Sequence, residues 1–68
     1  MINETVETPE MALKRAIEAA GGPTKLGRQL GISGAAVVMW GRLPATRVLE
    51  VERITGVAKE LLRPDLYR

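Results

Sequence analysis

Hydrophobic residues recur every three or four positions along most of the chain, a spacing that is typical of amphipathic α-helices. The first such segment begins at Thr8, whose hydroxyl can cap a helix, and Pro9, which is favoured in the first helical turn. We predict that this helix runs to about Ala20 and ends at the glycine pair 21–22. Its apolar residues share one face: Leu13, Ala16, Ile17 and Ala20.

Two short helices joined by a tight turn are predicted next. The second helix covers Pro23 to Leu30, and the third runs from Ser33, its N-cap, to about Trp40. Between them, Gly31 can adopt the positive φ that such a turn requires. The helical repeat directs Val37 and Trp40 toward the core. It leaves an outer face on the third helix made of Gly34, Ala35, Val38 and Met39.

The last part of the chain predicts one longer helix and a short one. Pro44 starts the fourth helix, which runs to about Thr55 and is ended by Gly56. A further helical turn or two covers residues 57–62, and residues 66–67 are expected to fold back onto the body. No segment predicts a strand. The pattern therefore indicates an all-α fold, a small bundle of four to five short helices.

Charge divides the chain into an acidic start and a basic body. Glu4, Glu7 and Glu10 stand among the first ten residues, where there is no Lys or Arg. From Met11 onward, ten Lys and Arg residues stand against five Asp and Glu residues, a net charge of +5. Residues 1–8 are predicted to form a flexible acidic tail and residues 9–68 a single domain. A body with this excess of positive charge can attract a polyanion such as double-stranded DNA.

Composition excludes several classes of chemistry. The chain has 68 residues, with no cysteine and no histidine. It therefore lacks disulfides, thiolate nucleophiles, Cys/His zinc sites and histidine acid–base catalysis, so we expect no metal, no cofactor, no small-molecule substrate and no enzymatic activity. No apolar run approaches the ~20 residues of a membrane span. We therefore expect no membrane association and a cytoplasmic location.

The most informative stretch is PTKLGRQLGISGAAVVMW, residues 23–40. Two short helices pack closely at a steep angle only where a contact residue is very small, and Gly27 supplies that residue. Ile32 fills the corner of the turn, and Val37 and Trp40 complete a buried set. This arrangement is typical of a helix-turn-helix, in which the second helix enters the DNA major groove.

Further motifs narrow the resemblance. The chain carries AAGG before the second helix, W-x-R-x-P after the third, LE-x-E-R-x-TG in the fourth and a closing LRPDLY. With these motifs it resembles the Cro and repressor proteins of phages and prophages, in particular the YdaS-type branch, over all but the acidic tail. The resemblance implies a lambda-repressor/Cro-like helix-turn-helix domain that binds operator DNA and regulates transcription as a repressor, often as a homodimer, in a bacterial or phage-encoded protein.

The resemblance also implies which residues touch DNA. Base-facing positions are those of the outer face of the third helix, Gly34, Ala35, Val38 and Met39. Phosphate contacts are implied for Thr24, Lys25, Ser33 and Arg42, and the placement of basic residues around the unit adds Arg28 and Arg47.

The outer face of the third helix departs from the family pattern, because it carries no hydrogen-bond donor. Bidentate reading of guanine or adenine needs Arg, Lys, Asn or Gln, whereas Ala, Val and Met can touch thymine methyl groups. Contiguous apolar patches also mark protein interfaces. The alternative function is therefore a helix-turn-helix module that binds a protein partner through this face. Glu52, in the apolar arc of the fourth helix, is expected to form a partly buried ion pair with an Arg.

Overall fold

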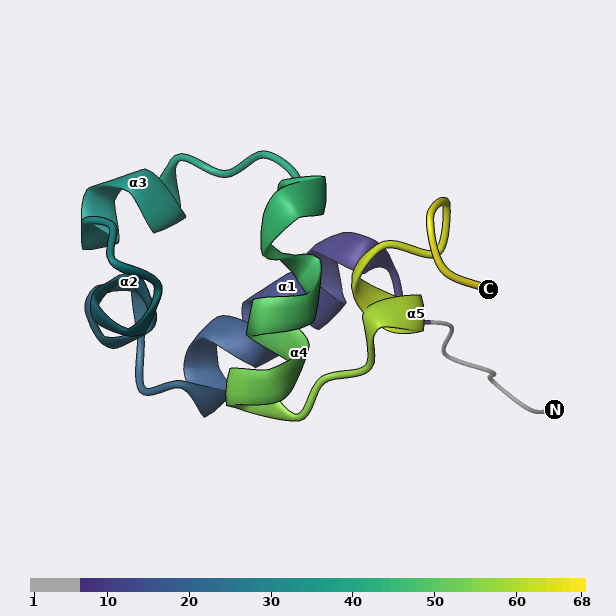
Figure 1. The fold of residues 1–68 in the computed structure, drawn as a ribbon, viewed down its shortest axis with the longest axis horizontal. Coiled ribbons are helices and arrows are strands. Elements are labelled where there is room, and N and C mark those ends of the chain that lie inside the picture. The colour runs from purple at the N-terminus through teal and green to yellow at the C-terminus, as the bar shows by residue number, and fades with distance from the viewer. Residues whose placement is uncertain (1–6) are drawn as a thin grey trace, which may run out of the picture.

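The computed structural model describes residues 7–68, and the part it describes is all-helical, as the pattern predicts. It contains α1 (Pro9–Ala19), α2 (Pro23–Leu30), α3 (Gly34–Val38), a 3₁₀ turn η1 (Ala45–Arg47), α4 (Val48–Thr55) and α5 (Lys59–Leu62) (Figure 1). None of the helices in residues 7–68 is both long enough and apolar enough to cross a membrane.

Helix ends follow the capping residues of the sequence. The Thr8 hydroxyl accepts a hydrogen bond from the Met11 amide at 3.2 Å, and the Ser33 hydroxyl accepts one from the Ala36 amide at 3.0 Å. At the end of α2, Gly31 adopts φ of 78°, and the Ile32 amide donates to the Gly27 carbonyl at 2.8 Å. This left-handed cap turns the chain sharply toward α3.

Three helices are shorter than predicted, and one of them is α5, which begins at Lys59 rather than at residue 57. α3 covers Gly34–Val38 rather than reaching Trp40, and Met39 is its C-cap. α4 begins at Val48 rather than at Pro44, because Pro44 is extended, with ψ of 141°, and a 3₁₀ turn over residues 45–47 precedes the helix. The tighter turn is common at helix ends, where few backbone bonds hold the regular geometry.

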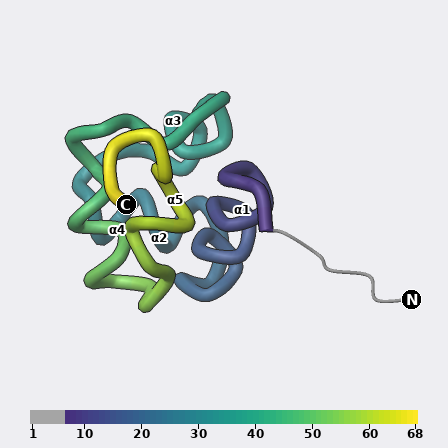
Figure 2. Tube along the Cα trace, turned by 90° about the vertical axis from the view of Figure 1, so that its right-hand side faces the viewer, coloured from purple at the N-terminus to yellow at the C-terminus, as the bar shows by residue number. Residues whose placement is uncertain are grey.

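The core lies where α1, α4 and α5 meet and continues to the helix-turn-helix unit. Figure 1 shows α2 and α3 at one end of the molecule and α5 with the C-terminus at the other, with α1 and α4 between them. Seen from the α5 end, α1 and α4 lie on either side of α5 (Figure 2). Fully buried side chains join these elements: Ala12, Ala16, Leu26, Val37, Leu43, Val48, Val51, Val57 and Leu62.

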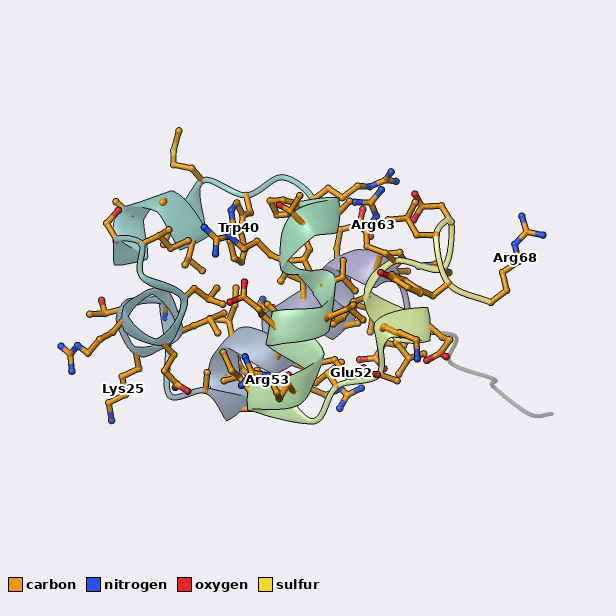
Figure 3. All side chains as sticks on the ribbon, in the orientation of Figure 1. Lys25, Trp40, Glu52, Arg53, Arg63 and Arg68 are labelled. Atoms are coloured by element: carbon orange, nitrogen blue, oxygen red, sulfur yellow. The ribbon has the colours of Figure 1, made fainter. Side chains whose placement is uncertain are left out.

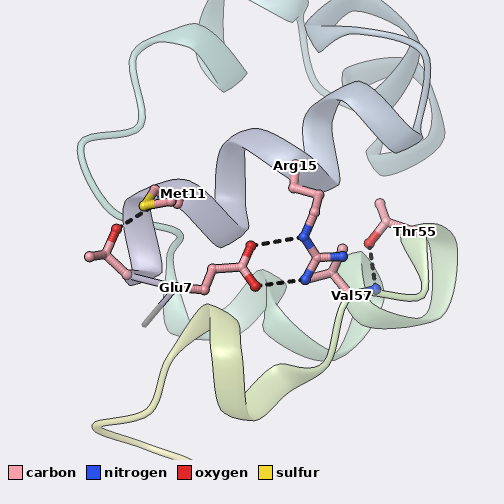
Figure 4. A network of polar contacts seen from close by, with 6 residues as sticks. Glu7, Met11, Arg15, Thr55 and Val57 are labelled. Atoms are coloured by element: carbon pink, nitrogen blue, oxygen red, sulfur yellow. Dashed lines mark hydrogen bonds and ion pairs between the residues drawn. The ribbon is translucent and has the colours of Figure 1, made fainter. Parts of the chain in front are cut away.

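Two acidic side chains have partners that the sequence did not predict. Glu52 accepts a hydrogen bond from the Lys59 backbone amide at 2.9 Å, so it caps α5. The ion pairs found among residues 7–68 do not include Glu52, so the expected ion pair, for which an Arg was the candidate partner, is wrong. A helix end offers free amides that a carboxylate satisfies equally well. Glu7 makes a bidentate pair with Arg15 at 2.8 and 2.9 Å (Figure 4). This hydrogen-bonded pairing lowers the pKa of Glu7.

Two residues of the predicted N-terminal tail contact α1. Glu7 and Thr8, assigned to the tail from the sequence, are bound to α1 through a side-chain pair and a helix cap. The rest of the predicted flexible tail, residues 1–6, lies outside the described residues. Glu7 and Thr8 thus contact the domain, and the boundary expected after residue 8 stays a prediction.

Candidate nucleic-acid interface

Two glycines hold α2 and α3 in close contact. A Cβ on Gly27 of α2 would lie 2.7 Å from the Ile32 carbonyl oxygen and 2.9 Å from the Ser33 carbonyl carbon. A Cβ on Gly34 of α3 would lie 2.8 Å from the Thr24 hydroxyl and 2.9 Å from its Cα. Gly27 thus lets α2 approach the turn closely, and Gly34 lets the start of α3 approach α2. α2, the turn at residues 31–33 and α3 form the rigid helix-turn-helix unit that the sequence predicts.

The orientation expected for Gly34 is different in the structure. The sequence placed Gly34 on the outer face of α3, whereas its missing side chain points at Thr24, on the first turn of α2. The reason is the short turn, which brings the start of α3 directly against α2. Thr24 itself is exposed, and so is Ser33, whose hydroxyl caps α3.

The rest of the predicted outer face is open to solvent. Ala35 is exposed, Val38 is 67% exposed and Met39 is 81% exposed. On the opposite side, Val37 is only 1% exposed, and Trp40 packs against the core between α3 and α4 (Figure 3). α3 therefore separates buried from exposed residues as the helical repeat predicts, and its solvent side carries apolar groups alone.

Three of the predicted phosphate-binding cations are exposed on α2 and on the loop that follows α3. Lys25 and Arg28 are exposed on α2, and among residues 7–68 neither has an acidic side chain within ion-pair distance. Lys25 projects from α2 away from the body of the protein (Figure 3). Arg42 follows the end of α3 by a few residues and is 64% exposed. These exposed cations lie on the helix-turn-helix unit and directly after it, so they can contact a polyanion that binds this end of the molecule.

Arg47, also predicted to bind phosphate, instead forms hydrogen bonds to other residues of the domain. Its Nη1 donates to the Leu30 carbonyl at 3.3 Å, at the end of α2, and to the Glu50 carboxylate at 3.2 Å. Only 31% of its side chain is exposed. The Arg47 guanidinium thus ties the end of α2 to the start of α4, and the sequence did not reveal this because its two partners lie on different elements.

Comparison with known proteins places the chain in a family. A family model described as bacterial toxin YdaS matches residues 13–68. This chain belongs to the YdaS family. It is similar to the gene 30 protein of Enterobacteria phage phi80, with 35% identity over 74 aligned positions that cover 98% of this chain and 97% of that protein. No solved structure matches. The resemblance to YdaS-type phage and prophage proteins is therefore confirmed.

In this YdaS family member, the C-terminal segment holds the loop that follows α3. Arg63 is only 12% exposed, and its Nη1 donates to the Leu43 carbonyl at 2.8 Å. The same guanidinium makes two hydrogen bonds to Asp65, at 2.9 and 2.7 Å, and Asp65 also lies 3.8 Å from Arg42. Sequence reasoning left Arg63 without a role, although the RPD motif was visible. The structure shows that the motif fixes the position of the loop that carries Arg42.

The carboxylate of Asp65 should make stability depend on pH. Hydrogen bonding to Arg63 lowers its pKa from 3.8 to about 2 in the folded chain. A lowered folded-state pKa stabilises the fold fully above 3.8, and this contribution is lost as the pH falls through about 2. We expect Asp65→Asn to lower the melting temperature at neutral pH, and we expect the difference from wild type to shrink toward pH 2.

Thermal unfolding followed by circular dichroism at several pH values measures this effect. Glu18→Gln is the control, because Glu18 is exposed and has no ion-pair partner among residues 7–68. A difference between Asp65→Asn and wild type that stays the same from neutral pH to pH 2 would contradict the assignment.

Proposed function

We propose that this YdaS family member is a DNA-binding transcription regulator of Cro type that inserts α3 into the major groove and contacts the flanking phosphates. The observation that carries the proposal is the placement of three exposed cations, Lys25, Arg28 and Arg42, around a helix-turn-helix unit whose second helix has an uncovered outer face. Major-groove binding requires such an uncovered helix, and backbone phosphates require cations beside it.

The rigidity of the unit supports the same proposal. Phosphate contacts position a protein on the duplex only if their spacing is held, and here Gly27 and Gly34 hold α2 against α3 while Arg63 holds the loop that carries Arg42. The cations on α2 and the cation after α3 therefore keep a defined separation. A flexible basic surface would bind DNA without fixing the orientation of α3.

The name of the family mentions a toxin, and the proposal accounts for that without an enzymatic activity. A protein that occupies promoter DNA blocks transcription and so impairs growth of the cell that contains it. DNA occupancy is the activity that the exposed features of this chain support.

Salt dependence of duplex binding tests the proposal. Three phosphate contacts per chain, at about −0.9 each, give an expected slope near −2.7 in a plot of log K against log salt concentration. Fluorescence anisotropy with a labelled random duplex, read over a series of salt concentrations, measures the slope. In vitro selection from random duplexes then shows whether one sequence is preferred. No binding at low salt, or a slope near zero, would refute the proposal.

A second candidate function rests on the apolar face of α3. Val38 and Met39 are exposed to a degree that is also found at protein interfaces. In this alternative the helix-turn-helix serves as a module that binds a protein partner, and DNA binding is weak and unspecific. Lys25 and Arg28 favour DNA, because they are exposed without an ion-pair partner among residues 7–68 and an apolar protein partner would supply none.

A further inference from the structure

The exposed side of α3 has an unusual chemical composition for a helix that reads DNA. Every residue from Gly34 to Met39 is Gly, Ala, Val or Met, so none carries a side-chain N–H or O–H group. Next to this run, the Ser33 hydroxyl lies before the first helical residue and accepts from the Ala36 amide, and Trp40 packs inward between α3 and α4 (Figure 3). Hydrogen-bonded reading of base edges by side chains of this helix is therefore excluded.

The groups that α3 does present are methyl groups. Ala35, Val38 and Met39 are exposed together, and Val38 and Met39 lie at the end of the helix, toward the loop that carries Arg42. In the major groove, the C5-methyl of thymine is the one apolar group that distinguishes a base pair. An apolar surface gains free energy only where it buries another apolar surface, so the groove that suits α3 is one lined by such methyl groups.

The charges near α3 indicate which kind of partner binds its exposed side. Lys25 lies next to Thr24, which contacts the first residue of α3, and Arg42 follows the last turn of the same helix. Arg42 therefore stands beyond one end of the apolar patch, and Lys25 belongs to the turn of α2 that contacts the other end, although its side chain lies near Gly21. Exposed cations on α2 and after α3 complement a groove that has a phosphate backbone on each side. An apolar protein surface would offer Lys25 no charged partner, and among residues 7–68 Lys25 has none of its own.

We propose that α3 recognises DNA through the C5-methyl groups of pyrimidines, with Ala35, Val38 and Met39 as the contacting residues and no base-specific hydrogen bond from this helix. This rests on the proposed function and names the feature of DNA that the same site selects. Duplexes rich in thymine are preferred. The methyl group of 5-methylcytosine can make the same contact as the methyl group of thymine. Removing the methyl groups weakens binding although every base pair keeps its hydrogen-bonding pattern.

The experiment compares a short alternating adenine–thymine duplex with the same duplex in which uracil replaces thymine. Wild-type protein should bind the uracil duplex about fourfold more weakly for each thymine methyl that α3 covers, the effect of burying about one methylene-sized group. A second pair, with cytosine or 5-methylcytosine at the same positions, should show the methylated duplex bound more tightly. Anisotropy at one fixed salt concentration measures all four duplexes.

A protein variant separates methyl contacts from changes in DNA shape. In the double variant Val38→Ala/Met39→Ala, the ratio of thymine to uracil affinity should fall toward one, because the contacting groups are gone. Leu66→Ala is the matched control: Leu66 is an exposed apolar residue in the C-terminal segment beyond α5, and this change should leave the ratio as in wild type. Both substitutions fall on exposed side chains, so the fold should persist.

The outcomes distinguish the inference from the proposed function. Salt-dependent binding of wild type with equal affinity for thymine and uracil duplexes would overturn methyl recognition and leave DNA binding intact. A thymine preference that survives unchanged in Val38→Ala/Met39→Ala would also overturn it, because the DNA shape would then be the cause. If that variant binds DNA like wild type but changes its sedimentation, the face joins two chains, and the inference is again overturned. Absence of any duplex binding would refute the proposed function itself.

Discussion

Replacing Gly27 with alanine is expected to lower the free energy of unfolding by about 2–3 kcal/mol. The added Cβ would meet backbone atoms of Ile32 and Ser33 at 2.7 to 2.9 Å, and backbone cannot rotate away as a side chain can. α2 must therefore move away from the turn, which disturbs the buried cluster to which Leu26 and Val37 belong. The higher helix propensity of alanine returns only about 1 kcal/mol.

This decrease is large for a domain of such size, since about 3–10 kcal/mol is typical for the total. Urea denaturation followed by the fluorescence of Trp40 measures it, and the melting temperature should fall by about 10–20 °C. Gly41→Ala is the matched control, because Gly41 has no positive φ and nothing lies within 4 Å of its added Cβ. Equal stability of Gly27→Ala and Gly41→Ala would show that α2 does not approach the turn as closely as the structure indicates.

Replacing Lys25 and Arg28 together with alanine is expected to weaken duplex binding about 60-fold at about 0.1 M salt. Each phosphate contact that is removed takes about 0.9 from the salt slope, so the slope should become less negative by about 1.8. The weakening should be similar for every duplex sequence, because these cations are assigned to phosphates and not to bases. Both side chains are exposed and lack an ion-pair partner among residues 7–68, so stability should be unchanged.

The double variant Arg53→Ala/Arg68→Ala is the control, with the same change in net charge. Both side chains are exposed, and Figure 3 shows Arg53 on α4 and Arg68 at the end of the molecule opposite Lys25. We expect only a small change in affinity and slope, because screening weakens charges beyond about 10 Å. If the two double variants weaken DNA binding equally, net charge rather than the α2 surface is responsible.

Local features of this fold could be predicted because they depend on neighbouring residues. The caps at Thr8 and Ser33, the left-handed turn at Gly31 and the buried face of α3 each follow from a few consecutive side chains. Where tertiary packing intervened, the expectation was wrong. Pro44 was expected to start a helix on propensity alone, but the chain remains extended there while it passes from α3 to α4.

The candidate site also has features that the sequence predicts and features that only the structure shows. Exposure of Val38, Met39, Lys25 and Arg28 follows from the helical repeat, and the structure agrees with it. The hydrogen bonds from Arg47 to Leu30 and Glu50 could not be predicted from the sequence, because the Leu30 carbonyl comes seventeen residues earlier in the chain. A long, flexible cation reaches many acceptors, and its choice among them depends on which helices lie within range.

The order of residues along the chain was enough to specify the class of the protein: an all-α chain whose glycines, turn and buried residues form a helix-turn-helix, and whose motifs place it among YdaS-type proteins. Those features are local, since capping, positive φ and helical periodicity act over one or two turns. Three contacts emerged only from the packed helices: Gly34 faces Thr24, Arg63 holds the loop after α3, and Arg42 stays exposed beside Asp65. They join residues far apart in the chain, so they exist only once the helices have come together.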